Sequence, residues 1–598
     1  MLTDPFTLAA TAKLTSTYRV RQVIYLVEFN WAKDASDLTD PSSGTWINET
    51  TFVTAASGSS QFMPVERRVL GTGVIPPAQC NITLNNTAGR FSPYRTDGAL
   101  YANIGGGKIF QTPVRIWAGL FDPTPTFAGA LLADIVSPTA ALAIVTTESD
   151  AMTAGEIIKI DNEYMLIVKA NFIGGGTTHC TVRRGIYNTT ATTHDMDADV
   201  NILGAMVRIF TGVIADPSEQ SESHHVTFTC YDRSHLIGQY QASTIAYKDQ
   251  LPDALIGLFM DTLTGVAGAP SYLPVPDAQQ AFDFGNYLIP NGFMEAESPL
   301  VEASLVAVAD GGVFWFNSEG QARFYNGSHF VGAASAYTLD HQNTIAFVLK
   351  DDRTNVFNTV TARYAPRALS PSQVVWTSNE PVVIAPNGGT FTTTAKFRFP
   401  CDVVTTPVAN TDFFVATSGG DDLSADVTIT SFVAYALHAA ITFTNAHATQ
   451  QAYLGNLRVR GQPFLGAVTQ TVSETRTTSP TNITPRDLAL PENYYRQSFG
   501  QVSALCTFVA DRVKTVRPSY TCTFKGNPLL ELGDMVTFDE DISLTTDRTA
   551  FIDSLNWNLS PKSGFTQNIT TSDASDWYQA SNYHIVGTTA LGSGSVWY

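Results

Sequence analysis

The chain has 598 residues, and 44% of them are hydrophobic, which is enough to fill the cores of several domains and excludes a disordered protein. Asp and Glu number 54 against 35 Lys and Arg, and the net charge of −19 disfavours sequence-specific nucleic-acid binding and adhesion to anionic membranes. Only 15% of the residues are charged, which indicates neutral surface that partner proteins cover.

Signals for export or for a metal are few. Asp4 and Pro5 stand where a signal peptide carries basic residues, and the most apolar long stretch, 128–145, is interrupted by Asp134 and Pro138. The six cysteines form no C-x-x-C pair, so we expect reduced, mostly buried thiols. The sequence predicts a soluble protein made in a cytoplasm, with no membrane insertion, no metal and no cofactor.

The N-terminal region predicts strands joined by turns. Residues 18–31 are rich in β-branched and aromatic side chains, and alternation returns at 81–84. After Asn85 and Asn86 comes the run Gly89, Arg90, Phe91, Ser92, Pro93. Glycine and asparagine tolerate a positive φ, so this run predicts a tight connection closed by an aromatic side chain.

Two segments share the pattern V-R-I-aromatic-x-G-apolar, which we identify at 114–120 and at 207–213. In the first, Val114 and the residues at 116 and 118 alternate with Arg115 and the residues at 117 and 119, the period of a strand with one buried face. The second contains Gly212. The pattern predicts two neighbouring strands of one sheet, with residues 123–205 inserted between them as a small β domain.

The insert ends in a run of alternating acids, Asp195, Asp197 and Asp199, which is how an EF-hand calcium loop begins. Such a loop needs glycine at its sixth position and glutamate at its twelfth, where this chain has Val200 and Met206. The pattern therefore favours a solvated turn over a calcium site.

Three stretches have a helical period. In 253–268 the apolar residues form one stripe with Asp253 as the expected N-cap, and a second helix is expected from Ser298, with Pro299 at its first position, to 310. A hairpin over 313–325 follows, which gives an α+β domain at 239–350. A capping box at 498–501 predicts the third helix.

The C-terminal third returns to strands. Residues 374–476 are rich in Thr, Val and Phe with glycine turns, typical of an antiparallel sandwich. Near the end, Gly533 and Asp534 predict a turn in which Gly533 has a positive φ and Asp534 accepts hydrogen bonds from backbone N–H groups.

Several of these motifs, in this order, resemble the signature of the baseplate hub or tail-tip hub proteins of tailed bacteriophages. In the first half of the chain the resemblance covers Gly89, Arg90, Phe91, Ser92, Pro93, Val114, Arg115, Gly212 and Asp232, and in the second half Pro528, Gly533 and Asp534. The insert is similar to a small β module of virion proteins through Arg184, Gly185 and His194.

The resemblance implies a mainly β, multidomain fold with an α+β part, two hub β-barrel domains and inserted small β domains. The first barrel would be 1–122 with 206–238, interrupted by the insert 123–205 and followed by the α+β domain 239–350. The second barrel, which carries the third helix, would be 351–373 with 477–571, interrupted by the sandwich-like insert 374–476. A C-terminal arm, 572–598, would end the chain.

The resemblance also implies a function. The chain would be a structural virion protein, a homotrimeric hub at the tail tip or baseplate that joins the tail tube to the tip and forms the channel for genome passage. Its partners would be itself, a distal tail protein or tail-tube ring, a tape-measure protein, and a tip or fibre protein.

A second hypothesis is a β-rich adhesin that binds or cleaves glycans, which the aromatic content and the modular strands permit. An adhesin displays aromatic platforms beside carboxylates in an open groove, whereas a hub hides its apolar surface in ring contacts. The sequence holds no G-x-S-x-G, H-E-x-x-H or Walker motif, so we predict no catalytic residue and no enzyme activity.

Overall fold

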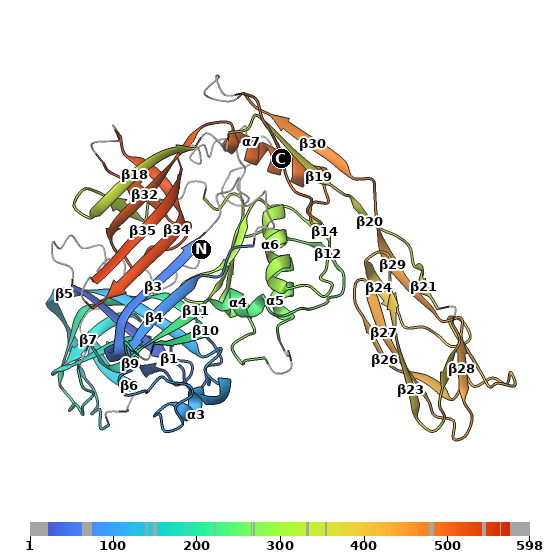
Figure 1. Cartoon of the computed structure of the whole chain (residues 1–598), viewed down its shortest axis with the longest axis horizontal. Helices are drawn as coiled ribbons and strands as arrows, with labels where there is room; N and C mark the ends of the chain where they lie inside the picture. The colour runs from blue at the N-terminus through green and yellow to red at the C-terminus, as the bar shows by residue number, and fades with distance from the viewer. Residues whose placement is uncertain are drawn as a thin grey trace.

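One sheet of 17 strands runs through most of the molecule, and smaller sheets and helices lie around it (Figure 1). The computed structural model describes residues 22–61, 74–137, 139, 142–147, 152–187, 189–220, 222–264, 266, 269–330, 334–352, 356–378, 380–477, 484–540, 544, 546–561 and 564–574. Within these ranges the chain is mainly β, as expected, and its strands form several sheets. The expected C-terminal arm lies outside the described residues beyond 574.

The first half of the large sheet has the pairing order β2-β1-β5-β10-β11-β4-β3, with every pair antiparallel. Its strands are β1 (Gln22–Phe29), β2 (Ile47–Asn48), β3 (Val53–Gln61), β4 (Gln79–Asn85), β5 (Pro113–Leu131), β10 (Asp199–Gln220) and β11 (His225–Tyr231). Its connections contain η1 (Thr50–Phe52), α3 (Tyr101–Ile104) and η2 (Gly105–Gly107). Val114 on β5 pairs with Gly212 on β10, so the two V-R-I strands are neighbours, as predicted.

The second half has the order β17-β33-β34-β35-β32-β18. Its strands are β17 (Tyr337–Leu339), β18 (Thr344–Asp352), β32 (Arg517–Lys525), β33 (Met535–Phe538), β34 (Arg548–Ser560) and β35 (Gly564–Asp573). Strand β3 joins the halves, because it pairs with β4 on one side and with β34 on the other. Strand β17 and all but the last two residues of β18 fall within the range expected for the α+β domain, and the division into domains stays a prediction.

The two halves share one topology. When the strands are numbered in chain order, β1, β3, β4, β5, β10 and β11 on one side and β17, β18, β32, β33, β34 and β35 on the other, both halves have the order 1-4-5-6-3-2. Strand β2 is extra, and β17 runs parallel to β33 whereas β1 runs antiparallel to β5. Among the described residues, the pairing leaves each half open between its two end strands.

The expectation that the V-R-I strands bury only one face is wrong. Val114, Ile116 and Ala118 face the core of the first half, as alternation requires. Arg115 and Trp117, on the other face, are also fully buried. The loop that follows β1 covers Arg115, whose Nη1 donates to the carbonyl of Pro41, and the insert covers Trp117. Alternation predicts the strand, but it does not show what packs on its second face.

The insert continues directly from β5 and returns directly into β10. Its own strands are β6 (Leu142–Thr147), β7 (Glu156–Ile160), β8 (Glu163–Gly174) and β9 (Thr177–Ile186). The pairing runs β5-β6-β9-β8-β7-β10 and returns to β5, so it forms a closed circle. One apolar cluster unites Ile157, Leu166 and Ile186 of the insert with Ile24, Leu26 and Trp117 of the first half.

The α+β part packs beside the first half. It contains α4 (Arg233–Ile237), β12 (Tyr247–Gln250), α5 (Pro252–Asp261), η3 (Asp277–Gln279), β13 (Gln280–Phe282), β14 (Ile289–Gly292), α6 (Pro299–Ala309), β15 (Val313–Phe316) and β16 (Ala322–Tyr325). Helix α6 and the β15–β16 hairpin are as predicted. Asp253 is not the N-cap of α5, which begins at Pro252 with Leu251 as its cap, because Asp253 accepts instead from the backbone N–H of Gly285.

The remaining elements form an arm that extends from the body (Figure 1). Helix α7 (Phe499–Val513) packs on the sheet of β19 (Thr359–Tyr364), β30 (Gln470–Thr475) and β31 (Asp487–Ala489), and Ser498 caps it as predicted. Beyond this sheet lie β20 (Arg367–Leu369), β21 (Gln373–Thr377), β22 (Val382–Ile384), β23 (Gly389–Lys396), β24 (Cys401–Thr405), β25 (Phe414–Ala416), β26 (Val427–Ala434), β27 (His438–Asn445), β28 (Ala452–Gly455) and β29 (Arg458–Gly466).

Candidate functional site

The joint between the two halves is the candidate site, because residues from three parts of the chain meet there. Strand β3 pairs with β34 over six residues, from Ala56 opposite Leu559 to Gln61 opposite Ser554. Gly58 lies against Trp557, and a Cβ at that glycine would stand 2.3 Å from the indole. Only a residue without a side chain fits there, so the joint is closely packed.

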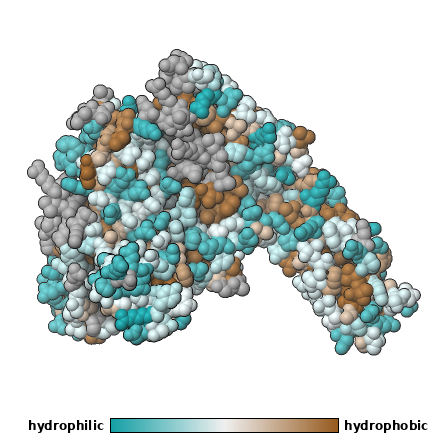
Figure 2. Space-filling view, in the orientation of Figure 1, coloured by the Kyte–Doolittle hydropathy of each residue, from teal (hydrophilic) through white to brown (hydrophobic). Residues whose placement is uncertain are grey.

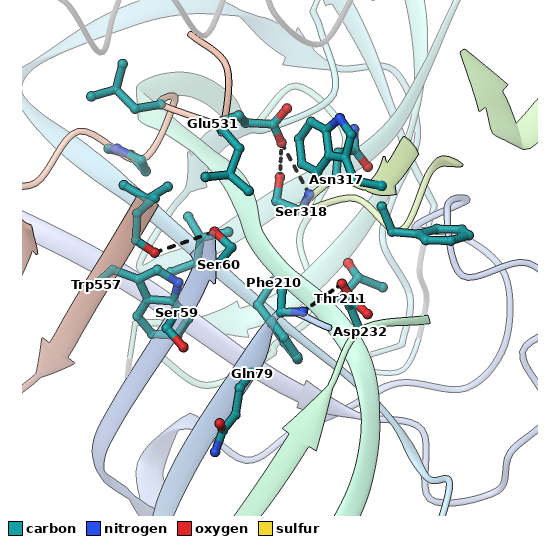
Figure 3. A pocket seen from close by; sticks show the side chains of 18 of the residues that line it. Ser59, Ser60, Gln79, Phe210, Thr211, Asp232, Asn317, Ser318, Glu531 and Trp557 are labelled. Carbon is teal, nitrogen blue, oxygen red and sulfur yellow. Dashed lines mark hydrogen bonds between the residues drawn. The ribbon is translucent and has the colours of Figure 1, made fainter. Parts of the chain in front are cut away.

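A cavity of about 40 Å³ lies in this joint (Figure 3). Ser59 and Ser60 line it from β3, Asn317 and Ser318 from the β15–β16 turn, and the lining also includes the expected motif residues Asp232 and Pro528. Glu531 faces Ser318, whose backbone N–H donates to Oε1 at 3.3 Å. The cavity is large enough for one or two waters. The carboxylate of Glu531 is held by the β15–β16 turn, more than 200 residues away in the chain, so this contact ties two distant segments together.

Asp232 ties the first half to the α+β part. It caps α4, and its Oδ1 accepts from the backbone N–H of Ser234 at 3.0 Å. Its Oδ2 accepts from the N–H of Ala78 at 2.9 Å, and its own N–H donates to the carbonyl of Ala78. Burial raises the pKa of Asp232 to about 6. All of these contacts are structural.

The Gly533–Asp534 turn has the predicted geometry. Gly533 has a φ of +84°, and Oδ2 of Asp534 accepts from the backbone N–H of Glu531 at 2.8 Å. Burial and the nearby carboxylate of Glu531 raise the pKa of Asp534 to about 7. The backbone of both turn residues is hydrogen-bonded to that of Ile552. The carbonyl of Ile552 accepts from the N–H of Gly533, and its N–H donates to the carbonyl of Asp534, each at 2.9 Å.

The Gly89–Pro93 run forms the predicted tight connection. Gly89 has a φ of +67°, and Phe91 is fully buried beside Trp31 and Phe228. The side chain of Asn86 organises the run: its Oδ1 accepts from the N–H of Phe91, and its Nδ2 donates to Ser92 and to Glu219 of β10. Arg90 pairs with the buried Glu49 at 2.6 Å. The connection therefore fixes the end of β10.

Arg115 belongs to a buried charge cluster that the sequence motif does not show. Its Nε lies 2.6 Å from Oε2 of Glu28, and both side chains are buried. Trp117 donates to the same carboxylate, and Arg183 of the insert reaches its other oxygen at 3.2 Å. Burial opposes the charge of Glu28, but the charges of Arg115 and Arg183 hold its pKa below the usual value. Burial lowers the pKa of Arg115 to about 10.

Arg184, Gly185 and His194 of the insert converge on one carboxylate, that of Glu163. Arg184 reaches both of its oxygens at 2.6 Å, and Gly185 donates its backbone N–H to it. Nε2 of His194 lies 2.9 Å from Oε2, and Nδ1 of the same ring lies 2.7 Å from Asp161. Although burial favours the neutral acid, the hydrogen bonds from Arg184 and His194 hold the pKa of Glu163 below its usual value.

The structure thus brings the motif residues together in separate groups. Asp232 and Pro528 line the same cavity at the joint, and Arg184, Gly185 and His194 all contact Glu163 in the insert. The residues that organise these groups were missed: Glu28, Glu163 and Trp557. The sequence did contain an indication for Glu28. It is a lone carboxylate inside the apolar strand 22–29, and such a group requires a buried cation nearby.

Within the part of the chain that the structure describes, no three His, Cys, Asp or Glu side chains are grouped to hold a metal ion. No helix among the described residues is long and apolar enough to cross a membrane. All six cysteines are buried and free, as predicted.

No protein-family model matches the chain, and no curated protein matches its sequence. Solved structures do match. A tail protein from Neisseria meningitidis MC58 aligns over 93% of this chain and 98% of its own, with 8% identity and a TM-score of 0.40. The 43 kDa tail protein of prophage MuSo2 from Shewanella oneidensis aligns over 92% and 98%, with 8% identity and a TM-score of 0.40. The prophage tail protein gp18 from Listeria monocytogenes aligns over 72% and 94%, with 8% identity and a TM-score of 0.29. These three matches are to phage tail proteins, and each alignment spans most of this chain.

Proposed function

We propose that this chain is the hub of a phage tail tip or baseplate, a structural virion protein that connects the tail tube to the tip. The duplication of the sheet carries the proposal. Each chain contributes two halves of equal topology. A threefold ring of chains therefore presents six similar units, which is the number of subunits in a sixfold tube ring. The order of the sequence motifs points to the same class.

Each half is proposed as one hub barrel that is open along one seam. In the first half the end strands β2 and β3 are joined only by residues 49–52, which include η1, and in the second half the end strands β17 and β18 are joined only by residues 340–343. The two edges of each half are therefore tethered to each other by a short connection. A curled sheet of this kind forms a wall of the channel for genome passage.

The surface supports an assembled rather than a free chain. The charged fraction is 15%, and large apolar side chains stand exposed on the body and on the arm, among them Phe110, Ile345, Val348, Phe414 and Val433. Such side chains are expected to be covered by partners. The partners proposed are two further copies of the chain, a distal tail protein or tail-tube ring, a tape-measure protein, and a tip or fibre protein.

Electron microscopy of the purified protein tests the proposal. We expect a threefold ring with an axial opening. Antibodies against the part of the arm that contains β20–β29 should label the tail end of virions. A stable monomer, a dimer or a plain sixfold ring would overturn the hub assignment. A hydrolytic activity against host cell wall that survives purification and is lost on substitution of a carboxylate would favour the glycan-cleaving alternative.

A further inference from the structure

The β-sandwich of the arm has two unlike outer faces. Its sheets are β22-β28-β25 and β23-β27-β26, and their inner faces share one apolar core. The outer face of the second sheet is rich in hydroxyl groups, and those of Thr392 and Thr442 lie 3.0 Å apart. The threonines on this face are Thr390, Thr392, Thr394, Thr428, Thr442 and Thr444. A polar face of this kind is ordinary for a sheet that is exposed to water.

The outer face of the β22-β28-β25 sheet is apolar instead. Residues directly opposite each other in an antiparallel pair lie on the same face, and the faces alternate along each strand. Val382, Leu454 and Val415 form a row that points into the core, so the rows on either side of it point outward. The outward rows are Val383, Tyr453 and Ala416 on one side, and Gly455 and Phe414 on the other.

This apolar face is open to solvent. Phe414 is 53% exposed and Val383 is 49% exposed. A Cβ placed on Gly455, directly opposite Phe414, would meet no atom within 4 Å, so the space beside the aromatic side chain is unfilled. Figure 2 shows a hydrophobic area on the arm, in the region where Figure 1 draws β28. A contiguous apolar patch on the surface of a folded domain indicates a binding site.

A carboxylate borders this patch. Ala416 forms an antiparallel β-bridge with Asp422, so the side chain of Asp422 lies on the outer face, at the end of the row that begins with Val383. Its Oδ1 accepts from the backbone N–H of Ser424 at 2.8 Å and from the hydroxyl of Ser424 at 2.5 Å. These bonds orient the carboxylate, and Oδ2 accepts from no residue that the structure describes.

The size of the patch favours a small ligand over a second protein chain. Three strands about 4.8 Å apart, each with up to two outward residues about 6.8 Å apart, give an area of roughly 200 Å². A stable protein interface takes about 800 Å² from each partner. Small ligands, in contrast, bind to a few aromatic and apolar side chains with a small number of polar groups that fix their orientation.

The charge of the arm favours an uncharged ligand. Residues 367–466 contain five Lys and Arg against six Asp and Glu, so this part of the chain has almost none of the net charge of −19. It therefore attracts neither cations nor anions strongly. The carboxylate of Asp422 at the border of the patch repels an anionic ligand.

We propose that this face binds an uncharged glycan. A pyranose ring has one apolar face of C–H groups and a rim of hydroxyl groups. It lies on Phe414 and Tyr453, which supply flat aromatic surface, while Asp422 accepts hydrogen bonds from the rim. A hydrogen bond to a carboxylate is stronger than one to a neutral oxygen. The proposal adds a binding activity to the arm and does not depend on the hub assignment.

Saturation-transfer NMR on the full chain tests the proposal. The probes are neutral saccharides: glucose, galactose, mannose, N-acetylglucosamine and N-acetylgalactosamine, each as methyl glycosides and as short oligomers. We expect at least one of them to bind in the millimolar range. Phe414→Ala and Asp422→Asn should each weaken that binding by about tenfold or more. Phe284→Ala removes an aromatic ring that is 81% exposed outside the arm, so it is the matched control and should leave binding unchanged.

A blocking variant separates loss of the site from loss of the fold. Gly455→Leu has room for its side chain, so the melting temperature should stay that of the wild type. The added side chain lies beside Phe414 and should abolish saccharide binding. Thr392→Leu places the same side chain on the outer face of the other sheet and should leave binding unchanged.

The proposal is overturned if no saccharide of the panel binds, or if binding survives both Phe414→Ala and Gly455→Leu. Two other occupants of the face would also overturn it. Association of the wild-type chain that Gly455→Leu abolishes would assign the face to a second copy. Adsorption to phosphatidylcholine vesicles that Gly455→Leu abolishes would assign it to lipid. We expect the native mass of every variant to match that of the wild type, so the hub assignment is tested separately.

Discussion

Ile214 and Ile552 occupy the same position in the two halves of the molecule. Each exchanges two backbone hydrogen bonds with a turn, Gln111–Thr112 or Gly533–Asp534, in which the first residue has a positive φ. The turns place β5 and β33, which follow them, against β10 and β34. The relationship shows that a local backbone geometry is repeated although the side chains differ.

The first prediction concerns Gly533. Replacing it by Val should destabilise the protein by about 1 to 3 kcal/mol, because a β-branched residue is strained at a positive φ. Gln111 offers the matched control, since Gln111→Gly relieves a similar backbone strain and should leave stability unchanged within about 1 kcal/mol. Chemical denaturation of both variants measures the difference. Equal losses for the two variants would contradict this explanation of the turn.

The second prediction concerns the buried pair of Arg115 and Glu28. Glu28→Gln should cost about 3 to 5 kcal/mol, because it leaves Arg115 and Arg183 without their carboxylate in a buried site. Arg363 and Glu492 form an exposed pair at 3.0 Å, so Arg363→Ala should cost about 0 to 1 kcal/mol. Thermal unfolding of the two variants under one buffer condition compares them. If Glu28→Gln destabilises the protein as little as Arg363→Ala does, the buried pair of Glu28 and Arg115 does not hold β1 against β5.

The third prediction concerns removal of the insert. Phe121 pairs with Gly204, so a two-residue Asn-Gly turn can replace residues 122–203 without moving either strand. The bare deletion should nevertheless reduce the soluble yield, because Ile24 and Leu26 are buried against the insert. The deletion combined with Ile24→Thr and Leu26→Thr should recover part of that yield. Full solubility of the bare deletion would show that the first half does not depend on the insert, which would then be the separate small β domain that the sequence predicts.

The fourth prediction concerns Glu163. Glu163→Gln should loosen the insert, because Arg184 and His194 lose the shared carboxylate, and hydrogen exchange should rise in β8 and β9 but not in β3 or β4. The pKa of Glu163 is depressed, so its contribution is present above the ordinary value of 4.5 and is lost as the pH falls through the lower folded value. The effect of the substitution should therefore shrink in strong acid. Asp161→Asn is the matched control, because Asp161 is exposed and contacts only the second nitrogen of His194.

The sequence indicated most of the elements and the pairing of β5 with β10, but its local patterns did not show how the two halves of the sheet correspond. Period-2 alternation, the Pro299 helix start and the Ser498 cap depend on neighbouring residues, and the structure contains all three. The repeat is invisible to such reasoning, because Gln111 matches Gly533 and Thr112 matches Asp534 only in backbone geometry. The roles of Glu28 and Glu163 depend on partners 87 and 21 residues away in the chain, which local patterns cannot supply.

The last prediction concerns Asp534 and the pH dependence of stability. Its pKa is raised to about 7, mainly by burial, so the folded chain holds the proton through a range in which the unfolded chain, with a pKa near 3.8, has lost it. The free energy of unfolding therefore falls as the pH rises from about 4 to about 7. Above that range Asp534 is ionised in both the folded and the unfolded chain, and the free energy of unfolding falls no further through this group.

Asp534→Asn removes this titration and keeps an oxygen that accepts from the N–H of Glu531. The difference in melting temperature between variant and wild type should therefore move in favour of the variant between pH 4.5 and pH 7.5, by several degrees. Asp232→Asn is a poorer control because Asp232 caps a helix, so Asp97→Asn, at an exposed pair, serves as the reference and should show no such trend. A pH-independent difference at Asp534 would mean that the carboxyl is ionised in the folded chain at both pH values. If the variant instead assembled normally and lost an activity against cell wall, Asp534 would be a catalytic carboxylate and the structural assignment would fail.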